Sequence, residues 1–144
     1  MILDYNLMLD NAAAITVSRV STNVIDLTNA RDIGITEQDV EVLITVTTAF
    51  AGGTSLQATV QGSVDNTTFT DMVSSPVTIT ANLTQGANIL GIHFPNVVPG
   101  QAFPRYIRVN YTVVGTMTAG AVTATLVVDR QRNLGYPAGR AVAN

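Results

Sequence analysis

The sequence predicts an all-β fold, a single-domain, jelly-roll-like β-sandwich of about eight strands. Several stretches alternate apolar and polar residues with a period of two, which places one face of each strand on a core and the other in water. No window of about a dozen residues keeps the apolar period of 3.6 that a helix requires, and no βαβ alternation is present. A chain of 144 residues fits one domain with one sheet-on-sheet core. An immunoglobulin-like arrangement is the alternative topology.

Four stretches with the clearest alternation are expected to form the main strands, namely Val40–Thr48, Thr54–Val64, 106–113 and 122–128. In Thr54–Val64, the apolar residues Leu56, Ala58 and Val60 all point to one side. The strand Val40–Thr48 has an inward apolar row and carries Glu41 on its outer side. Weaker strands are expected at Ala14–Val20, Asn23–Thr28, Pro76–Ala81 and Asn88–Phe94, with turn-forming segments between them. Residues 37–41 are the one segment with a pattern that permits a turn of helix.

Both ends of the chain lie outside the strand pattern. We expect an N-terminal arm over residues 1–13, the sandwich over 14–130 and a C-terminal arm over 131–144. The front segment is rich in large apolar residues, and the back segment combines glycine and proline with Tyr136. Such side chains gain little in water, so we expect them to pack on their own domain or on a neighbour. A frayed terminus is the alternative.

Composition excludes several classes of function. The chain has no cysteine, so disulfides and thiolate chemistry are excluded, and all seven of its basic residues are arginines. Residues 1–71 carry a net charge of −7 and residues 72–144 a net charge of +4, which together give −3. This division argues against a uniformly basic nucleic-acid face and permits docking between copies or onto a partner. The N-terminus lacks the basic region of a signal peptide, and no apolar run approaches the ~20 residues of a membrane span.

Few residues offer catalytic or metal-binding chemistry. His93 is the single histidine, and its place in a strand favours a solvent-facing or hydrogen-bonded residue over a catalytic base. Glu37, Asp39 and Glu41 form the densest carboxylate group, for which a solvated loop is favoured over a calcium site. The segment around Gly52 and Gly53 contains no lysine and is not followed by an expected helix, and a phosphate-binding loop requires both. A hairpin turn is therefore expected there. We therefore expect no enzyme activity, no cofactor and no metal.

The best candidate for an exposed aromatic patch is Tyr106, which lies between Arg105 and Arg108, although an ordinary strand face is the alternative. Together with the two ends, this patch defines the candidate interface residues: Ile2, Leu3, Tyr5, Leu7, Leu9, Arg105, Tyr106, Arg108, Arg130, Arg132 and Tyr136.

Five short blocks resemble one family in order along nearly the whole chain: MILD at 1–4, STNVIDL at 21–27, ARDIG at 30–34, RYIRVNYTV at 105–113 and VVDRQ at 127–131. They are similar to the capsid cement (decoration) proteins of tailed double-stranded-DNA bacteriophages. The resemblance implies a jelly-roll domain on the outside of an icosahedral shell, assembled in the host bacterial cytoplasm. Its implied partners are the major capsid protein and copies of itself, as a dimer or trimer, with no nucleic acid and no membrane.

The resemblance implies that the protein bridges neighbouring capsid subunits and resists the outward pressure of packaged DNA. A phage tail, baseplate or fibre-associated binding module is the leading alternative, because such modules also use small sandwiches rich in threonine and glycine. A carbohydrate-binding module follows, although the chain has no tryptophan and only eight other aromatic residues for stacking on sugars. An enzyme is the third class, and a hydrolase would need a base other than His93.

Overall fold

The computed structural model describes residues 4–33, 40–95, 97 and 100–128. As predicted, these residues are almost entirely β: they form ten strands and two short 3₁₀ turns. The elements are η1 (Tyr5–Leu7), β1 (Met8–Ala14), β2 (Arg19–Val20), β3 (Ile25–Asp26), β4 (Val40–Gly52), β5 (Ser55–Ser63), β6 (Thr70–Ser74), β7 (Thr78–Ile79), η2 (Thr80–Asn82), β8 (Asn88–His93), β9 (Tyr106–Val114) and β10 (Met117–Val128). Within the described residues, no helix is long and apolar enough to cross a membrane.

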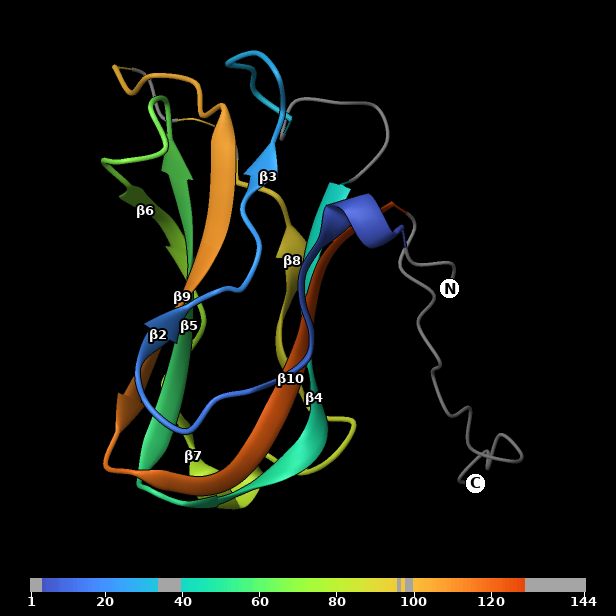
Figure 1. Ribbon diagram of the computed structural model, residues 1–144, viewed down its shortest axis with the longest axis vertical. Helices are drawn as coiled ribbons and strands as arrows, with labels where there is room; N and C mark the ends of the chain where they lie inside the picture. Colours follow the sequence, from blue (N-terminus) through green and yellow to red (C-terminus); the bar gives the residue numbers. More distant parts are fainter. Residues whose placement is uncertain (1–3, 34–39, 96, 98–99, 129–144) are drawn as a thin grey trace, which may run out of the picture.

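The strands form two antiparallel sheets that face each other, seen edge-on in Figure 1. The first sheet has the order β1-β10-β4-β8. The second has the order β2-β9-β5-β6, with β3 also paired to β9 and β7 also paired to β5. Because β2 and β3 share one partner strand, as do β6 and β7, each pair corresponds to one interrupted strand. The architecture then has eight strand positions. Two of the eight predicted strands, Ala14–Val20 and Asn23–Thr28, fall on the second position, and the first position, β1, was not predicted.

The pairing of these eight positions is nested, and this identifies the topology. The first pairs with the last (β1 with β10), the second with the seventh (β2 and β3 with β9), the third with the sixth (β4 with β8), and the fourth with the fifth (β5 with β6 and β7). This pattern arises when one long antiparallel ribbon is folded over on itself, and it is the pattern of a jelly roll. The prediction of a jelly-roll sandwich is therefore confirmed.

The alternation that predicted the main strands corresponds to the observed core. Leu56, Ala58 and Val60 of β5 are fully buried, and the register places Val109 and Tyr111 of β9 beside them. The first sheet contributes an equivalent inward row from β4, β8 and β10. Burial of these aliphatic side chains between the sheets supplies the main favourable term in folding.

Several predicted boundaries are wrong. The stretch Ala14–Val20 is not one strand, because the chain leaves the first sheet after Ala14 and enters the second at Arg19. The β6 strand was not predicted, and the stretch Pro76–Ala81 contains only the short β7 before η2 begins. Residues 8–13, expected in an N-terminal arm, belong to β1 at the edge of the first sheet. The C-terminal arm predicted for 131–144 lies outside the described residues.

Two predictions about β4 and β8 can be compared with the register. Glu41, expected in solvent, is only 7% exposed, because it lies on the outer side of β4 between its cross-strand neighbours Val127 and His93. His93 is exposed on the same outer side, as expected for a strand residue. Glu37 and Asp39, the other members of the carboxylate group, lie outside the described residues, and no described group of side chains could hold a metal ion.

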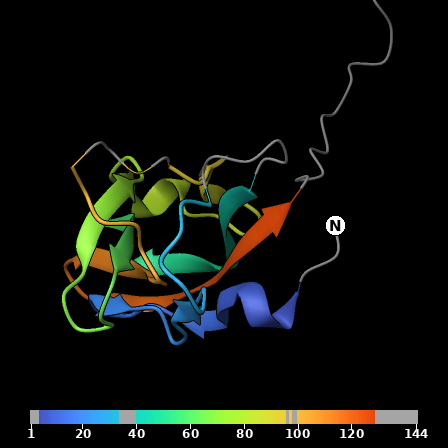
Figure 2. The same cartoon turned by 90° about the horizontal axis from the view of Figure 1, so that it is seen from above.

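The sandwich has two ends that differ in character. The upper end in Figure 1 carries the loop after β3, the β5–β6 turn and the start of β9, whereas the lower end carries β7, the β4–β5 turn and the β9–β10 turn. Seen from above in Figure 2, η1 lies beside the C-terminal part of β10. There the Thr125 hydroxyl donates a hydrogen bond of 3.1 Å to the carbonyl of Leu7. This hydrogen bond attaches the end of η1 to the first sheet, next to the start of β1.

Candidate interface

The predicted patch around Tyr106 lies on the outer face of the second sheet, near its upper end. Strand β9 alternates, so Ile107 and Val109 point into the core while Tyr106 and Arg108 point away from it. The register places Gln61 of β5 next to Arg108, and Asp71 of β6 on the other side of Gln61. We call the set formed by Asp26, Gln61, Phe69, Asp71, Arg105, Tyr106 and Arg108 the arginine face.

Arg108 is held in place by two neighbours. Its Nε donates to Oε1 of Gln61 at 2.8 Å, and its guanidinium carbon lies 3.6 Å from the centroid of the Phe69 ring. Gln61 in turn donates from Nε2 to Oδ1 of Asp71 at 2.6 Å. A chain of polar contacts therefore crosses three strands, and the half-buried Arg108 has its orientation fixed by stacking and by a hydrogen bond.

Arg105 is fixed in a similar way by Asp26, which follows Ile25 in β3. Nε and Nη2 of Arg105 donate to the two carboxylate oxygens of Asp26, each at 2.8 Å, and the guanidinium lies 4.9 Å from the centroid of the Tyr106 ring. The hydrogen bond from Arg105, aided by one from the backbone N–H of Thr28, lowers the pKa of Asp26 below its ordinary value. The Arg105 side chain remains 40% exposed, so a partner can still reach it.

The arginine face is suited to binding a protein surface. Its arginines, tyrosine and phenylalanine are residue types enriched in protein interfaces, and guanidinium groups pair well with carboxylates and carbonyls. The carboxylates of Asp26 and Asp71 lie within the same face, so it is mixed in charge. A run of phosphates would meet these two carboxylates, which disfavours nucleic acid as the partner.

The predicted N-terminal interface residues have different outcomes. Tyr5 is 75% exposed in η1 and remains a candidate contact. Leu7 is half-buried and packs against the protein's own core. Leu9 was a wrong choice: it is 0% exposed within β1, so its side chain belongs to the core and cannot contact a partner. Ile2 and Leu3 lie outside the described residues, as do the candidates Arg130, Arg132 and Tyr136.

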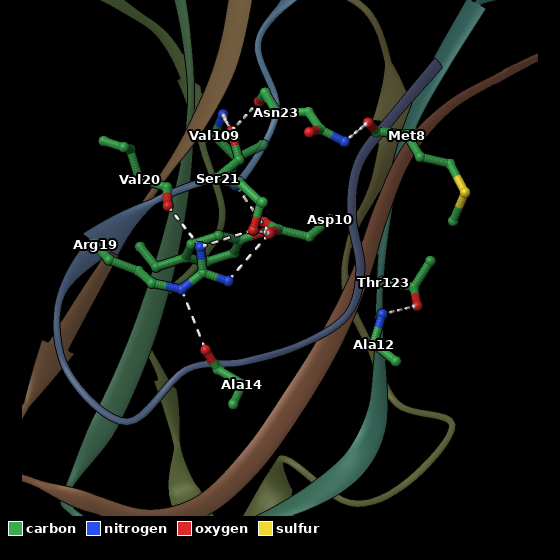
Figure 3. A network of polar contacts seen from close by, with 12 residues as sticks. Met8, Asp10, Ala12, Ala14, Arg19, Val20, Ser21, Asn23, Val109 and Thr123 are labelled. Atoms are coloured by element: carbon green, nitrogen blue, oxygen red, sulfur yellow. Dashed lines mark hydrogen bonds and ion pairs between the residues drawn. The ribbon is translucent and has the colours of Figure 1, made fainter. Parts of the chain in front are cut away.

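A buried polar network explains why β1 is part of the sandwich (Figure 3). The Asp10 carboxylate is 0% exposed and accepts hydrogen bonds from Nη2 of Arg19 at 3.0 Å and from the Tyr111 hydroxyl at 2.8 Å. The backbone N–H and the hydroxyl of Thr22 also donate to it, at 3.0 and 2.7 Å. Because a buried carboxylate needs such partners, this network ties β1 to β2 and to β9 of the opposite sheet.

The same network fixes Arg19 and Tyr111. The Arg19 guanidinium lies 5.6 Å from the centroid of the Tyr111 ring, and its Nε and Nη1 donate to the carbonyls of Ala14 and Val20. Burial, together with the nearby Asp10 carboxylate, raises the pKa of the Tyr111 hydroxyl well above its ordinary value. The hydroxyl is therefore a stable donor to Asp10 at neutral pH.

Sequence reasoning found Arg105, Tyr106 and Arg108 because they are close together in one strand. It missed Phe69 and Asp71, which join the arginine face only through the pairing of β6 with β5. The alternation of Thr54–Val64 did place Gln61 on the outer side, which was the one available signal. It also missed Asp10 as a structural centre, because its partners come from positions 19, 22 and 111.

Comparison with protein families gives a match over most of the chain. No curated protein matches the sequence. The model of the Bbp16 family matches residues 9–126, which is more than four fifths of the chain. The match begins in β1 and ends in β10, so it spans the sandwich from its first strand to its last. The chain therefore belongs to the Bbp16 family of phage-related proteins.

Proposed function

We propose that this protein is a structural virion protein that binds the outer surface of a phage capsid and cements neighbouring major capsid protein subunits against internal DNA pressure. Membership of a phage-related family supports a role in a phage particle. The resemblance of the five sequence blocks to capsid cement proteins supports the finer assignment. The jelly-roll sandwich is compatible with both.

The observation that carries the proposal is the arginine face. Arg105 and Arg108 are held by Asp26, Gln61 and Phe69 before any partner binds. Side chains that are already fixed lose little conformational entropy on binding, so more of the contact energy appears as affinity. A sheet face with fixed guanidinium groups suits a protein surface that offers carboxylates and carbonyls.

Cementing follows from mass action. A protein that binds the assembled lattice and not the separate subunits stabilises the lattice by about 2.7 kcal/mol per site when its free concentration is 100 times its Kd. Repetition over many equivalent sites multiplies this stabilisation. No reaction is needed for the role, so it requires no catalytic centre.

The test uses purified expanded shells of the parent phage that lack this protein. We expect the purified chain to co-sediment with the shells in a saturable manner and to raise the temperature at which they release DNA. Arg108→Glu should weaken binding by at least about tenfold, because it removes the contact with Phe69 and reverses a charge in the face. Arg31→Glu makes the same charge change outside the face and should bind nearly as well as the wild type.

Two results would refute the proposal. One is the absence of co-sedimentation with shells at micromolar concentrations. The other is binding to tails or baseplates only, which would support the alternative of a tail-associated module.

A further inference from the structure

A pocket opens at the upper end of the sandwich, between the β5–β6 turn, the start of β6 and the stretch that leads into β9 (Figure 1). Its volume is about 260 Å³, and its surface is mostly apolar. None of the described residues in its lining is charged. They include Gly62, Ser63, Thr70, Met72, Ala102 and Pro104.

One reason for the pocket is that the inward row of β5 ends in a glycine. Ala58 and Val60 fill the two preceding inward positions, and Gly62 has no side chain to fill the next. Its φ is not in the positive range, so the backbone does not require a glycine here. A Cβ would lie 2.8 Å from Sδ of Met72 and 2.9 Å from Cβ of Pro104. A glycine inside a strand often marks a place that a ligand or another segment approaches closely.

The walls of the pocket are fixed before any partner binds. The backbone N–H of Arg105 donates to the carbonyl of Ser63 at 2.8 Å, which ties the stretch before β9 to β5. In the β5–β6 turn, Oδ1 of Asp65 accepts from the backbone N–H groups of Thr67 and Thr68, at 2.9 and 2.8 Å. A preformed pocket loses little conformational entropy when it is filled.

Size and chemistry select a single apolar side chain as the occupant. A cavity of about 150 Å³ is enough to hold benzene, whereas pockets for drug-sized molecules and cofactors occupy roughly 300–1,000 Å³. The volume of this pocket lies between these limits. Its described lining has no aromatic residue for stacking on a sugar or a base, and no charged residue for binding a phosphate. Met72 has a flexible, polarisable side chain that adapts to apolar partners.

The pocket adjoins the arginine face at the start of β6. Thr68 and Thr70 line the pocket on either side of Phe69. The Phe69 ring lies 3.6 Å from the guanidinium carbon of Arg108, which covers it. The described partners of Arg108 are Gln61 and Phe69, which carry no charge, so its positive charge remains available to a carboxylate of a partner. An apolar pocket therefore lies beside a fixed and unneutralised guanidinium group.

We propose that the pocket takes a large apolar side chain from a surface loop of the lattice subunit, and that a carboxylate of the same loop pairs with Arg108. Stable interfaces combine a buried apolar group in a pocket with a polar rim, and the pocket and the arginine face supply one each. The inference rests on the proposed function, because it names the feature of the capsid protein that the arginine face recognises.

The first experiment uses the purified chain and a small probe in place of the loop. Labelling the four methionines with ¹³C at the methyl group makes Met72 a reporter of the pocket. N-acetyl-leucinamide should shift the Met72 signal in a saturable manner, with a Kd in the millimolar range. The signal of Met117, which is not in the lining, should stay in place. N-acetyl-serinamide, the matched probe without an apolar side chain, should shift neither signal.

A second pair of probes tests the neighbouring charge. The amide of N-acetyl-leucyl-glutamate should bind at low salt about threefold more tightly than the amide of N-acetyl-leucyl-glutamine, which is the gain expected from a partly exposed ion pair. Arg108→Gln should remove this difference and leave the binding of N-acetyl-leucinamide unchanged. An equal affinity of the two probes for the wild type would contradict the pairing of a carboxylate with Arg108.

Variants that fill the pocket relate the probe to the shell. Ala102 is an exposed lining residue, and Thr70 pairs with Gly62 across the sheet. Ala102→Phe and Thr70→Phe should each abolish the Met72 shift and weaken co-sedimentation with shells at least about tenfold. Ala30→Phe adds the same ring at an exposed alanine outside the lining and should behave as the wild type in both assays. Circular dichroism checks that each variant is folded.

Three results would overturn the inference. One is a Met72 signal that N-acetyl-leucinamide leaves unchanged at tens of millimolar. Another is normal shell binding by both filled variants. The third is a Met72 signal that changes with protein concentration in the absence of any probe, which would assign the pocket to a second copy of the chain.

Failure of this inference is distinguishable from failure of the proposed function. If the wild type and both filled variants co-sediment equally well with shells, the pocket is refuted as a contact and the capsid role stands. If the wild type binds the probe and does not co-sediment with shells, the capsid role is refuted and the preference of the pocket for an apolar side chain stands.

Discussion

Replacement of Asp10 by alanine tests whether the buried network holds β1 in the sandwich. Asp10 is 0% exposed and accepts from Arg19, Thr22 and Tyr111. Truncation removes this common acceptor from the first sheet and leaves Arg19 and Tyr111 of the second sheet, and Thr22, without it. We expect Asp10→Ala to fold less stably while keeping its β-rich structure.

The magnitude depends on which donors can turn to water. Thr22 is exposed, and the Arg19 side chain is 27% exposed, so both can be partly solvated. Tyr111 is fully buried, and a buried hydroxyl without a partner costs roughly 1–3 kcal/mol. Breaking a fully buried ion pair costs roughly 3–5 kcal/mol, and the exposure of Arg19 points to the lower part of that range. We therefore expect a loss of about 3 kcal/mol from a total of roughly 5–15 kcal/mol.

The assay is urea denaturation followed by circular dichroism, with the slope compared between variants to confirm two-state unfolding. Asp71→Ala removes an exposed carboxylate and should cost less than about 1 kcal/mol, which makes it the matched control. In a double-mutant cycle, Tyr111→Phe should recover part of the loss, because it removes the stranded hydroxyl. A loss under about 1 kcal/mol for Asp10→Ala, or strict additivity with Tyr111→Phe, would refute the reasoning.

Three further predictions concern stability. Because burial raises the pKa of Tyr111, the unfolded chain loses that proton first. The contribution of Tyr111 to stability should therefore be constant below about pH 10 and then fall by about 1.4 kcal/mol per pH unit until the native hydroxyl titrates. Urea midpoints from pH 8 to 11 should show this in the lysine-free wild type, and an equal fall in Tyr111→Phe would contradict it. Gly120→Ala should lower the free energy of unfolding by about 3 kcal/mol, because φ at this position is +137° and a Cβ would overlap the Phe50 ring. A melting temperature within about 2 °C of the wild type would exclude the clash. Deletion of residues 1–13 should abolish cooperative unfolding, because it removes Leu9 and Asp10 with β1, and a normal melt would show that β1 is dispensable.

Much of the fold could be predicted from the sequence because the inward rows of β4, β5, β9 and β10 are marked by regular alternation. Alternation shows which side of a strand is buried, and it does not show which strand is the neighbour. The nested pairing of β1 with β10 joins residues more than a hundred positions apart, and no local pattern records it. The short strands β2, β3, β6 and β7 contain too few residues for a period to be visible.

The predicted N-terminal boundary of the sandwich, at residue 14, is wrong for a physical reason. Asp10 interrupts an apolar run, and a carboxylate in a run of leucines usually signals the surface. Its burial depends on Arg19, Thr22 and Tyr111, so only the tertiary structure explains why β1 begins at Met8. Of the arginine face, the sequence predicted Arg105, Tyr106 and Arg108. The other members could not be predicted, because they join the face only through the pairing of β3 and β5 with β9 and of β6 with β5.

The low charge of the sequence was visible from composition, but its location was not. Charged residues are spread along both halves of the sequence, and the fold gathers the segments that have none at the lower end.

The most direct test of the central claim is an electron cryomicroscopy reconstruction of the virion that carries this protein. The proposed function predicts jelly-roll density at repeated positions over the whole outer shell, with the arginine face against the major capsid protein. A bare shell, or such density at the tail alone, would contradict it.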